Sequence, residues 1–132
     1  RDVAAIKNLC EMYVSGFIGA KTVINQAGGK AIAIGGTATT LGARKAGLKE
    51  YDGAKVTGVP LTQSDLRGYA KAFLALPVGE IEKLPCMPKK RADVIGGGAA
   101  WLYAIAEYLD LSEILVSDED NLEGYARKVG IL

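Results

Sequence analysis

Two glycine-rich segments contain the residues whose types and spacing best suit a bound ligand. The first, AIAIGGTATTL, covers residues 31–41, and the second, ADVIGGGAAWL, covers residues 92–102. In each segment a short apolar run leads into glycines, then into small residues and a helical pattern. Glycine has no Cβ, so the backbone at such a turn can approach a ligand closely. The free N–H groups at a helix start favour an anion or another polar group.

A glycine turn between a strand and a helix also has a plainer interpretation, which is close packing, and one turn alone does not decide between the two. Two such turns would lie at the same edge of a sheet if their strands are parallel, and open α/β sheets bind ligands at that edge. Neither segment matches G-x-x-x-x-G-K-[ST], so a P-loop is excluded. The candidate ligand-binding residues of the two turns are Gly35, Gly36, Thr37, Ala38, Thr39, Gly97 and Gly98.

The densest basic cluster, Lys89, Lys90 and Arg91, directly precedes the second glycine segment. Arg91 is the best candidate for a phosphate contact, because a guanidinium forms paired hydrogen bonds with phosphate oxygens. The alternative is a solvated loop, which is what most runs of charge are. Residues 118–120 are acidic and follow an apolar run; a helix cap explains them as well as a metal site does. We assign no metal ligand to them.

The composition excludes several classes of chemistry. The absence of histidine removes Ser-His-Asp and Cys-His catalysis and most zinc sites. The 16 basic and 15 acidic residues give a net charge of +1, so we expect no nucleic-acid partner. No apolar run is long enough to cross a membrane. Two distant cysteines, Cys10 and Cys86, suit free thiols, and we expect a cytoplasmic protein.

Hydrophobic periodicity across the 132 residues predicts one α/β domain with short parallel strands and flanking helices. Thr62 and Asp65 form an approximate capping box at the start of one helix. The predicted helices lie at about 2–25, with a break at Gly16 and Gly19, and at 39–48, 62–76, 78–83, 99–109 and 122–129. The predicted strands lie at 30–34, 92–95 and 113–118, and residues 50–60 are predicted to form a connection.

Four segments, in order and at matching spacing, resemble the exopolyphosphatase and guanosine pentaphosphate phosphohydrolase (Ppx/GppA) family. They are GGTATTL (35–41), YDGAKVTGVPLT (51–62), RADVIGGGAAWL (91–102) and ILVSDEDNLEGY (114–125), which together span most of the chain from Ala31 onward. The resemblance implies a ribonuclease H-like domain of the actin, Hsp70 and hexokinase type. In that fold two α/β domains hold a phosphate chain in a cleft, with Mg²⁺ assistance.

By this resemblance, residues 1–132 form the C-terminal half of a Ppx/GppA-like second domain, as a fragment of a longer chain. The parent protein is expected to hydrolyse terminal phosphoanhydride bonds of polyphosphate or of guanosine penta- or tetraphosphate. This segment would supply one wall of the ligand cleft and the hinge side, and it would be inactive alone. Its partners would be a phosphate-rich ligand and the missing N-terminal part of the protein.

The departures from the family pattern limit what carries over. The D-x-G-G-G-S phosphate loop and the catalytic Glu of the family are absent, so we assign no catalytic residue and expect the Mg²⁺ ligands elsewhere in the parent. The family's Leu-Pro-Gly-Leu becomes Leu84-Pro85-Cys86-Met87, with the loss of a glycine. Two other functions remain open: the ATP-binding half of a kinase or reactivating ATPase of the same superfold, and a non-catalytic assembly module, such as a homodimer joined through an unpaired sheet edge.

Overall fold

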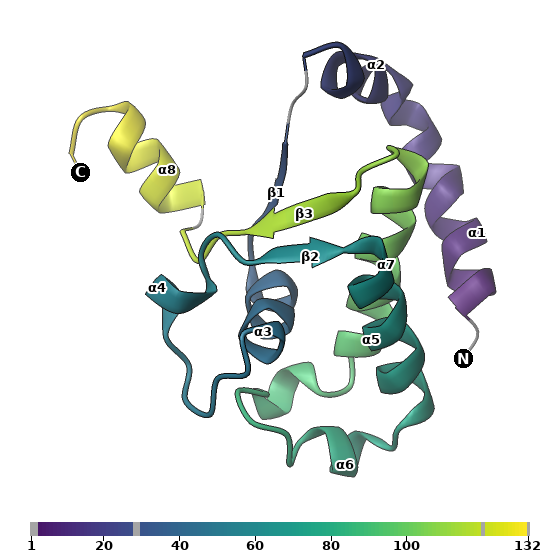
Figure 1. Ribbon diagram of the computed structural model, residues 1–132, viewed down its shortest axis with the longest axis vertical. Coiled ribbons are helices and arrows are strands. Elements are labelled where there is room, and N and C mark those ends of the chain that lie inside the picture. The colour runs from purple at the N-terminus through teal and green to yellow at the C-terminus, as the bar shows by residue number, and fades with distance from the viewer. Residues whose placement is uncertain (1–2, 28–29, 120, 132) are drawn as a thin grey trace.

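The computed structural model describes residues 3–27, 30–119 and 121–131 (Figure 1). Its helices are α1 (Val3–Val14), α2 (Ile18–Ala27), α3 (Gly36–Lys45), α4 (Gly53–Val56), α5 (Gln63–Ala75), α6 (Val78–Ile81), α7 (Ile95–Tyr108) and α8 (Asn121–Lys128). Two 3₁₀ turns, η1 (Ser15–Phe17) and η2 (Lys89–Arg91), accompany them. The strands are β1 (Ala31–Ala33), β2 (Pro60–Thr62) and β3 (Glu113–Val116).

The three strands form one small sheet in the order β1-β3-β2, so the α/β class is confirmed. Strands β1 and β3 are parallel, as predicted, with Ala31 beside Ile114. Strand β2 is antiparallel to β3, with Leu61 beside Ile114, and it lies where the sequence predicted a connection and a helix cap. The expectation of parallel strands alone is therefore wrong. A three-residue strand that begins with proline carries little pattern, and it is tolerated because β2 is an edge strand.

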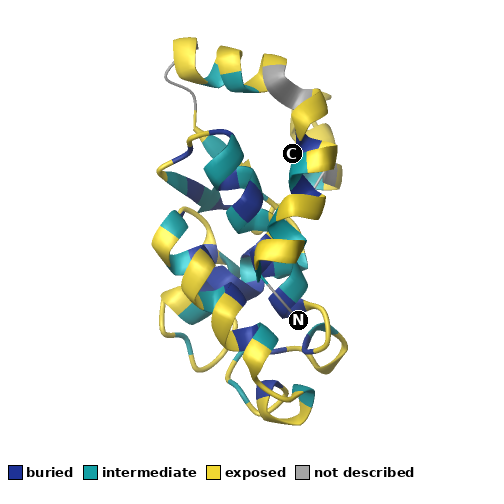
Figure 2. Cartoon of the chain, turned by 90° about the vertical axis from the view of Figure 1, so that its right-hand side faces the viewer, coloured by how far each residue is buried: buried dark blue, intermediate teal, exposed yellow. Residues whose placement is uncertain are grey.

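The core lies between the sheet and the helices α3, α5 and α7. Ile114, Val116 and Leu61 point from the sheet into this core and are almost fully buried. Helices α5 and α7 pack very closely: a Cβ added at Gly96 would lie only 3.0 Å from the backbone carbonyl carbon of Phe73. Buried residues gather in this middle layer in Figure 2, whereas α2, at the top of both views, is mostly exposed.

The predicted strand at 92–95 is wrong, because the chain there turns and enters α7 at Ile95. Helical hydrogen bonds already run from Val94 N–H to the Arg91 carbonyl (3.0 Å) and from Gly98 N–H to the Val94 carbonyl (2.9 Å). Ala92 and Ile95 are buried, and a short buried run does not distinguish a strand from a helix start. The second glycine cluster is therefore the first turn of a helix, and it follows no strand.

The other helices follow the predicted pattern. The first helical region breaks at Ser15–Phe17, close to Gly16, and α8 covers most of the predicted 122–129 helix. Helix α3 begins at Gly36, three residues before its predicted start. At α5 the capping box is complete: the Asp65 N–H donates to Thr62 Oγ1 (3.1 Å), and the Thr62 N–H donates to Asp65 Oδ2 (2.9 Å).

The Asp65 carboxylate gives stability a defined pH dependence. Burial opposes its ionisation, but hydrogen bonds from Lys45 and from Thr62 outweigh this and hold the pKa of Asp65 below its ordinary value. Because the folded-state pKa is the lower one, the stabilisation is complete above the unfolded carboxyl pKa of about 3.9 and is lost as the pH falls through the folded-state pKa. We therefore expect Asp65→Asn to lower the urea midpoint at pH 7 and to have a much smaller effect near pH 2.

Asp93→Asn is the matched control, because this carboxylate is exposed on the connection before α7. It should change the midpoint little at either pH. An Asp65→Asn defect of equal size at both pH values would contradict the assignment.

Candidate functional site

A pocket of about 430 Å³ opens beside the start of α3, between this helix and the segment before α7. Its lining combines hydroxyl, phenol and guanidinium groups with apolar side chains, which we call the apolar wall. The lining residues are Gly36, Thr39, Thr40, Tyr51, Leu84, Cys86, Met87, Pro88 and Arg91. A pocket of this size, with a few polar groups on an otherwise apolar wall, is typical of a small-molecule site.

The turn between β1 and α3 leaves the first helical N–H groups without a side-chain cap. Gly35 has φ 93°, a left-handed conformation that favours glycine, and it carries no capping side chain. Thr39 turns its hydroxyl back along the helix, to the carbonyls of Gly35 (3.2 Å) and Gly36 (3.3 Å). Helix α5, by contrast, has a complete capping box. The start of α3 is thus suited to an anionic ligand group.

The guanidinium of Arg91 lies directly against this helix start. A Cβ added at Gly36 would be only 2.0 Å from Arg91 Cζ, so the contact exists because residue 36 is glycine. The Arg91 N–H donates to the Pro88 carbonyl (2.9 Å), which fixes the backbone of η2. Within the described part of the chain Arg91 forms no ion pair. Its charge is available for a ligand in the pocket.

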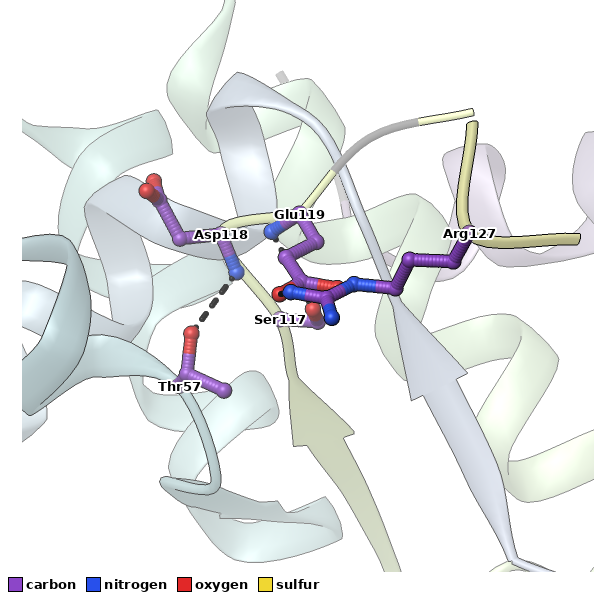
Figure 3. A network of polar contacts seen from close by, with 5 residues as sticks. All are labelled: Thr57, Ser117, Asp118, Glu119 and Arg127. Atoms are coloured by element: carbon purple, nitrogen blue, oxygen red, sulfur yellow. Dashed lines mark hydrogen bonds and ion pairs between the residues drawn. The ribbon is translucent and has the colours of Figure 1, made fainter. Parts of the chain in front are cut away.

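Tyr51 supplies a hydroxyl donor whose partner lies at the end of β3. The Tyr51 hydroxyl donates to Asp118 Oδ1, and the Asp118 N–H donates to Thr57 Oγ1 (3.0 Å), as Figure 3 shows for the second bond. Burial, and next the hydrogen bond to Asp118, raise the pKa of Tyr51. Tyr51 is therefore protonated at neutral pH and holds its ring at the pocket wall rather than acting as a base.

The apolar wall contains a strained cysteine. Cys86 has φ 59°, a conformation that favours glycine, and its Sγ lies 3.4 Å from the Leu48 carbonyl oxygen. This is the position at which the resembled pattern Leu-Pro-Gly-Leu has glycine. The neighbouring Met87 side chain is buried and also lines the pocket.

We expect Cys86→Gly to stabilise the fold by about 1 kcal/mol, because a left-handed conformation costs a non-glycine residue about 1–2 kcal/mol. Cys86→Ala is the matched control: it removes the thiol but keeps the strain. Chemical denaturation of both variants measures the difference. If the glycine variant is no more stable than the alanine variant, the conformation at residue 86 carries no strain.

The structure brings together only some of the predicted site residues. Gly36, Thr39 and Arg91 line the pocket together. Gly97 and Gly98 line a different hollow of about 480 Å³, beside Asp93 and Val94. The remaining predicted residues, Gly35, Thr37 and Ala38, are not among those that line the pocket, and Ala38 is buried in the core.

The two glycine turns nevertheless meet. A Cβ added at Gly98 would lie 2.7 Å from Thr37 Cγ2, so the starts of α7 and α3 touch although α7 follows no strand. We expected the two turns to meet because parallel strands would bring them to one sheet edge. They do meet, but the packing of helix α7 against α3 brings them together, and not the order of strands. Ligand contact by all these residues stays a prediction.

Sequence reasoning gave Tyr51, Leu84, Cys86 and Met87 no role in the site. The sequence predicts only a connection around Tyr51, and at residues 84–87 it shows only the loss of a glycine. The lost glycine was the available signal, because a glycine within a family pattern points to an unusual backbone conformation.

The described residues contain no cluster of three or more cysteine or acidic side chains able to hold a metal ion. Asp118 is engaged by Tyr51, and Asp120 lies outside the described residues. The described residues therefore show no cluster to which a metal ion can be assigned. Among the helices described, none is long and apolar enough to cross a bilayer.

Comparison with known proteins agrees with the resemblance. No protein-family model matches the chain. Exopolyphosphatase 2 of Mycobacterium tuberculosis is 30% identical over 99 residues, which are 72% of this chain and 31% of that protein. The crystal structure of the Aquifex aeolicus member of the Ppx/GppA family matches 98% of this chain with a TM-score of 0.82 and 25% identity, over 40% of its own length.

A second crystal structure, that of the type II variant of the Aquifex aeolicus Ppx/GppA phosphatase, matches 76% of this chain and 34% of that chain, with 29% identity and a TM-score of 0.72. The chain spans about a third of the length of the curated relatives it matches.

Proposed function

Because the chain belongs to the Ppx/GppA family, we propose that it forms one wall of a phosphate-binding cleft in such an enzyme. The parent protein would hydrolyse terminal phosphoanhydride bonds of polyphosphate or of guanosine penta- or tetraphosphate. One observation carries this proposal: the Arg91 guanidinium lies on Gly36, at the uncapped start of α3, inside a pocket.

This arrangement can hold a phosphate group in a fixed orientation. The guanidinium can donate two parallel hydrogen bonds to phosphate oxygens, and the helix N–H groups can donate hydrogen bonds to the same anion. Positioning and charge stabilisation account for most of the catalysis in phosphoryl transfer. Arg91 would thus orient the substrate, and the Thr40 hydroxyl would add a further polar group to the wall.

The described residues of the pocket include no base for activating water. Tyr51 is kept protonated, the sequence has no histidine, and the Asp118 carboxylate is already hydrogen-bonded to Tyr51. The activating carboxylate would come from the part of the parent that this chain does not contain. In such a parent, Mg²⁺ would neutralise charge on the phosphate oxygens.

Calorimetric titration of the chain with tripolyphosphate and, separately, with guanosine tetraphosphate tests the proposal. We expect Arg91→Met to weaken binding of at least one ligand about tenfold or more, since hydrogen bonds to charged groups contribute about 1.5–3 kcal/mol. Lys89→Met removes the same charge from an exposed position of η2 and should have little effect. Undetectable binding of both ligands, or equal losses in the two variants, would refute the phosphate site.

The proposal also requires that the chain alone has no hydrolase activity. Phosphate release from either ligand by the purified chain, abolished in Arg91→Met, would show that the reacting groups lie in this segment after all.

The apolar wall favours one alternative, the ATP-binding half of a kinase or reactivating ATPase. Leu84, Met87 and the Tyr51 ring could pack against the adenine ring of ATP. Binding of ATP, with none of tripolyphosphate or guanosine tetraphosphate, would support that function instead.

A further inference from the structure

Asp118, two residues after the end of β3, does not line the pocket beside α3, but it is hydrogen-bonded to a residue that does. The Tyr51 hydroxyl donates to Asp118 Oδ1 across 67 residues of sequence. Tyr51 in turn lines the pocket together with Arg91. Asp118 lies in the ILVSDEDNLEGY segment, to which the proposed phosphate site gives no role. The Tyr51 bond therefore connects this segment to the pocket.

Three residues of the segment before β2 hold Asp118 in place. Besides the bond from Tyr51, the Asp118 N–H donates to Thr57 Oγ1 (3.0 Å; Figure 3). A Cβ added at Gly53 would lie 2.2 Å from Asp118 Oδ2 and 2.7 Å from Asp118 Cγ, so the carboxylate lies directly on residue 53. The carboxylate is thus fixed from two sides. The bond to Thr57 uses the backbone of Asp118 and therefore survives a change of its side chain.

The Tyr51 hydroxyl lies between Asp118 and Thr39, which lines the pocket. Burial raises the pKa of Tyr51 most, the hydrogen bond to Asp118 raises it further, and the Thr39 hydroxyl acts in the opposite direction. Because the phenol proton is donated to Asp118, the hydroxyl is not free to donate to a ligand phosphate. What Tyr51 presents to the pocket is its ring.

The apolar wall suits a ligand that carries more than phosphate groups. A polyphosphate chain is charged along its whole length, so it gains nothing from Leu84, Met87 and the Tyr51 ring. A planar ring on the ligand can stack on the ring of Tyr51, and such stacking typically changes affinity about fivefold or more. A side chain that is already fixed loses less freedom when the ligand binds. The bond to Asp118 supplies this restraint.

We propose that Tyr51 is a specificity-determining residue and Asp118 a positioning residue: Asp118 holds the Tyr51 hydroxyl and so fixes the ring against which the base of a nucleotide packs. The pair makes the pocket prefer a phosphorylated nucleoside to a bare phosphate chain. This inference rests on the proposed phosphate site, in which Arg91 holds the phosphate end of the same ligand.

Calorimetric titration with guanosine tetraphosphate, which carries a ring, and with tripolyphosphate, which does not, tests both roles. Tyr51→Leu removes the ring and should weaken binding of guanosine tetraphosphate about fivefold or more. Asp118→Ala keeps the ring but releases it, and should weaken this binding about threefold or more. Neither variant should change the affinity for tripolyphosphate by more than about twofold, the usual scale for exposed charges.

Glu119→Ala is the matched control, because it removes a carboxylate from the next residue of the chain. Glu119 accepts hydrogen bonds from Arg127 at 3.0 and 2.5 Å, and in Figure 3 the Asp118 carboxylate points away from this pair. The control should leave both affinities nearly unchanged. Tyr51→Phe and Asp118→Ala remove the same hydrogen bond, so the double variant should bind guanosine tetraphosphate no more weakly than either single variant.

The ring Cζ signal of Tyr51 in carbon-13 NMR provides a readout that needs no ligand, and Tyr51→Phe identifies the signal. Asp118→Ala should lower the pKa of Tyr51, because the bond to the carboxylate favours the protonated phenol. Glu119→Ala should not change it. An unchanged pKa in Asp118→Ala would show that Asp118 does not hold Tyr51 in solution and would overturn the proposal.

Two results of the titrations would also overturn it. Equal weakening of both ligands by Asp118→Ala would mean a general distortion of the pocket, and equal effects of Asp118→Ala and Glu119→Ala would mean that Tyr51 is not involved. If Arg91→Met weakens both ligands while Tyr51→Leu and Asp118→Ala weaken neither, this inference fails and the phosphate site stands. If the unmodified chain binds neither ligand, the phosphate site fails and this inference with it.

Discussion

Gly36→Ala should weaken phosphate binding about as much as Arg91→Met does, by tenfold or more on the scale of a charge-assisted hydrogen bond. The added Cβ would overlap the guanidinium, with Arg91 Cζ at 2.0 Å and a guanidinium nitrogen at 2.1 Å. The fold should tolerate this change, because the end of a flexible side chain can move aside. Arg91 would then leave the start of α3, and titration with tripolyphosphate and guanosine tetraphosphate would measure the loss.

A double-mutant cycle makes this result specific. If Gly36 acts only by admitting Arg91, the double variant Gly36→Ala, Arg91→Met should bind no more weakly than either single variant. Gly68→Ala, on an open face of α5 with no atom within 4 Å of the added Cβ, is the control and should bind normally. Additive losses would show that the two residues act on the ligand separately.

Gly96→Val should destabilise the fold by about 3 kcal/mol, toward the upper end of the range for overpacking a core. Residue 96 is buried where α7 crosses α5, and its Cβ would meet the Phe73 carbonyl carbon and Leu74 Cδ2, both at 3.0 Å. A leucine side chain can rotate away, but the backbone of Phe73 cannot. Urea unfolding should therefore show a large fall in midpoint.

The adjacent residue provides the matched control. Gly97 lies in the same first turn of α7, and no atom lies within 4 Å of a Cβ added there. Gly97→Val should change stability by less than about 0.5 kcal/mol, as is usual for substitutions away from packed contacts. Equal losses at residues 96 and 97 would mean that helix propensity, and not the α5–α7 contact, explains the effect.

Several local features of the chain can be predicted from the sequence alone. The Thr62–Asp65 capping box, the break near Gly16 and the strands near residues 32 and 115 follow from short-range patterns, and the structure has all of them. The resemblance to Ppx/GppA proteins is also evident from the sequence, because four segments keep the order and spacing of the family. Comparison with known proteins confirms it.

The sequence could not show whether residues 92–95, before the second glycine cluster, form a strand or the start of a helix. Residues 92–95 form a short apolar run before glycines, as residues 31–34 do, yet one run pairs with β3 and the other enters α7. A strand exists only if a neighbour supplies hydrogen bonds, and that neighbour is distant in sequence. Strand β2 could not be predicted for the same reason, because its hydrogen-bonding partner β3 lies about fifty residues later in the chain.

The sequence by itself determined the small residues at the two turns, the cation at position 91 and the absence of histidine, because these are properties of residue type. Only the tertiary structure decided which of them share a site. It placed Arg91 on Gly36 and put Gly97 and Gly98 in another hollow, because the packing of α7 against α5 and α3 sets the direction in which each glycine faces. Residue type limits the chemistry, and the packing of distant segments places it.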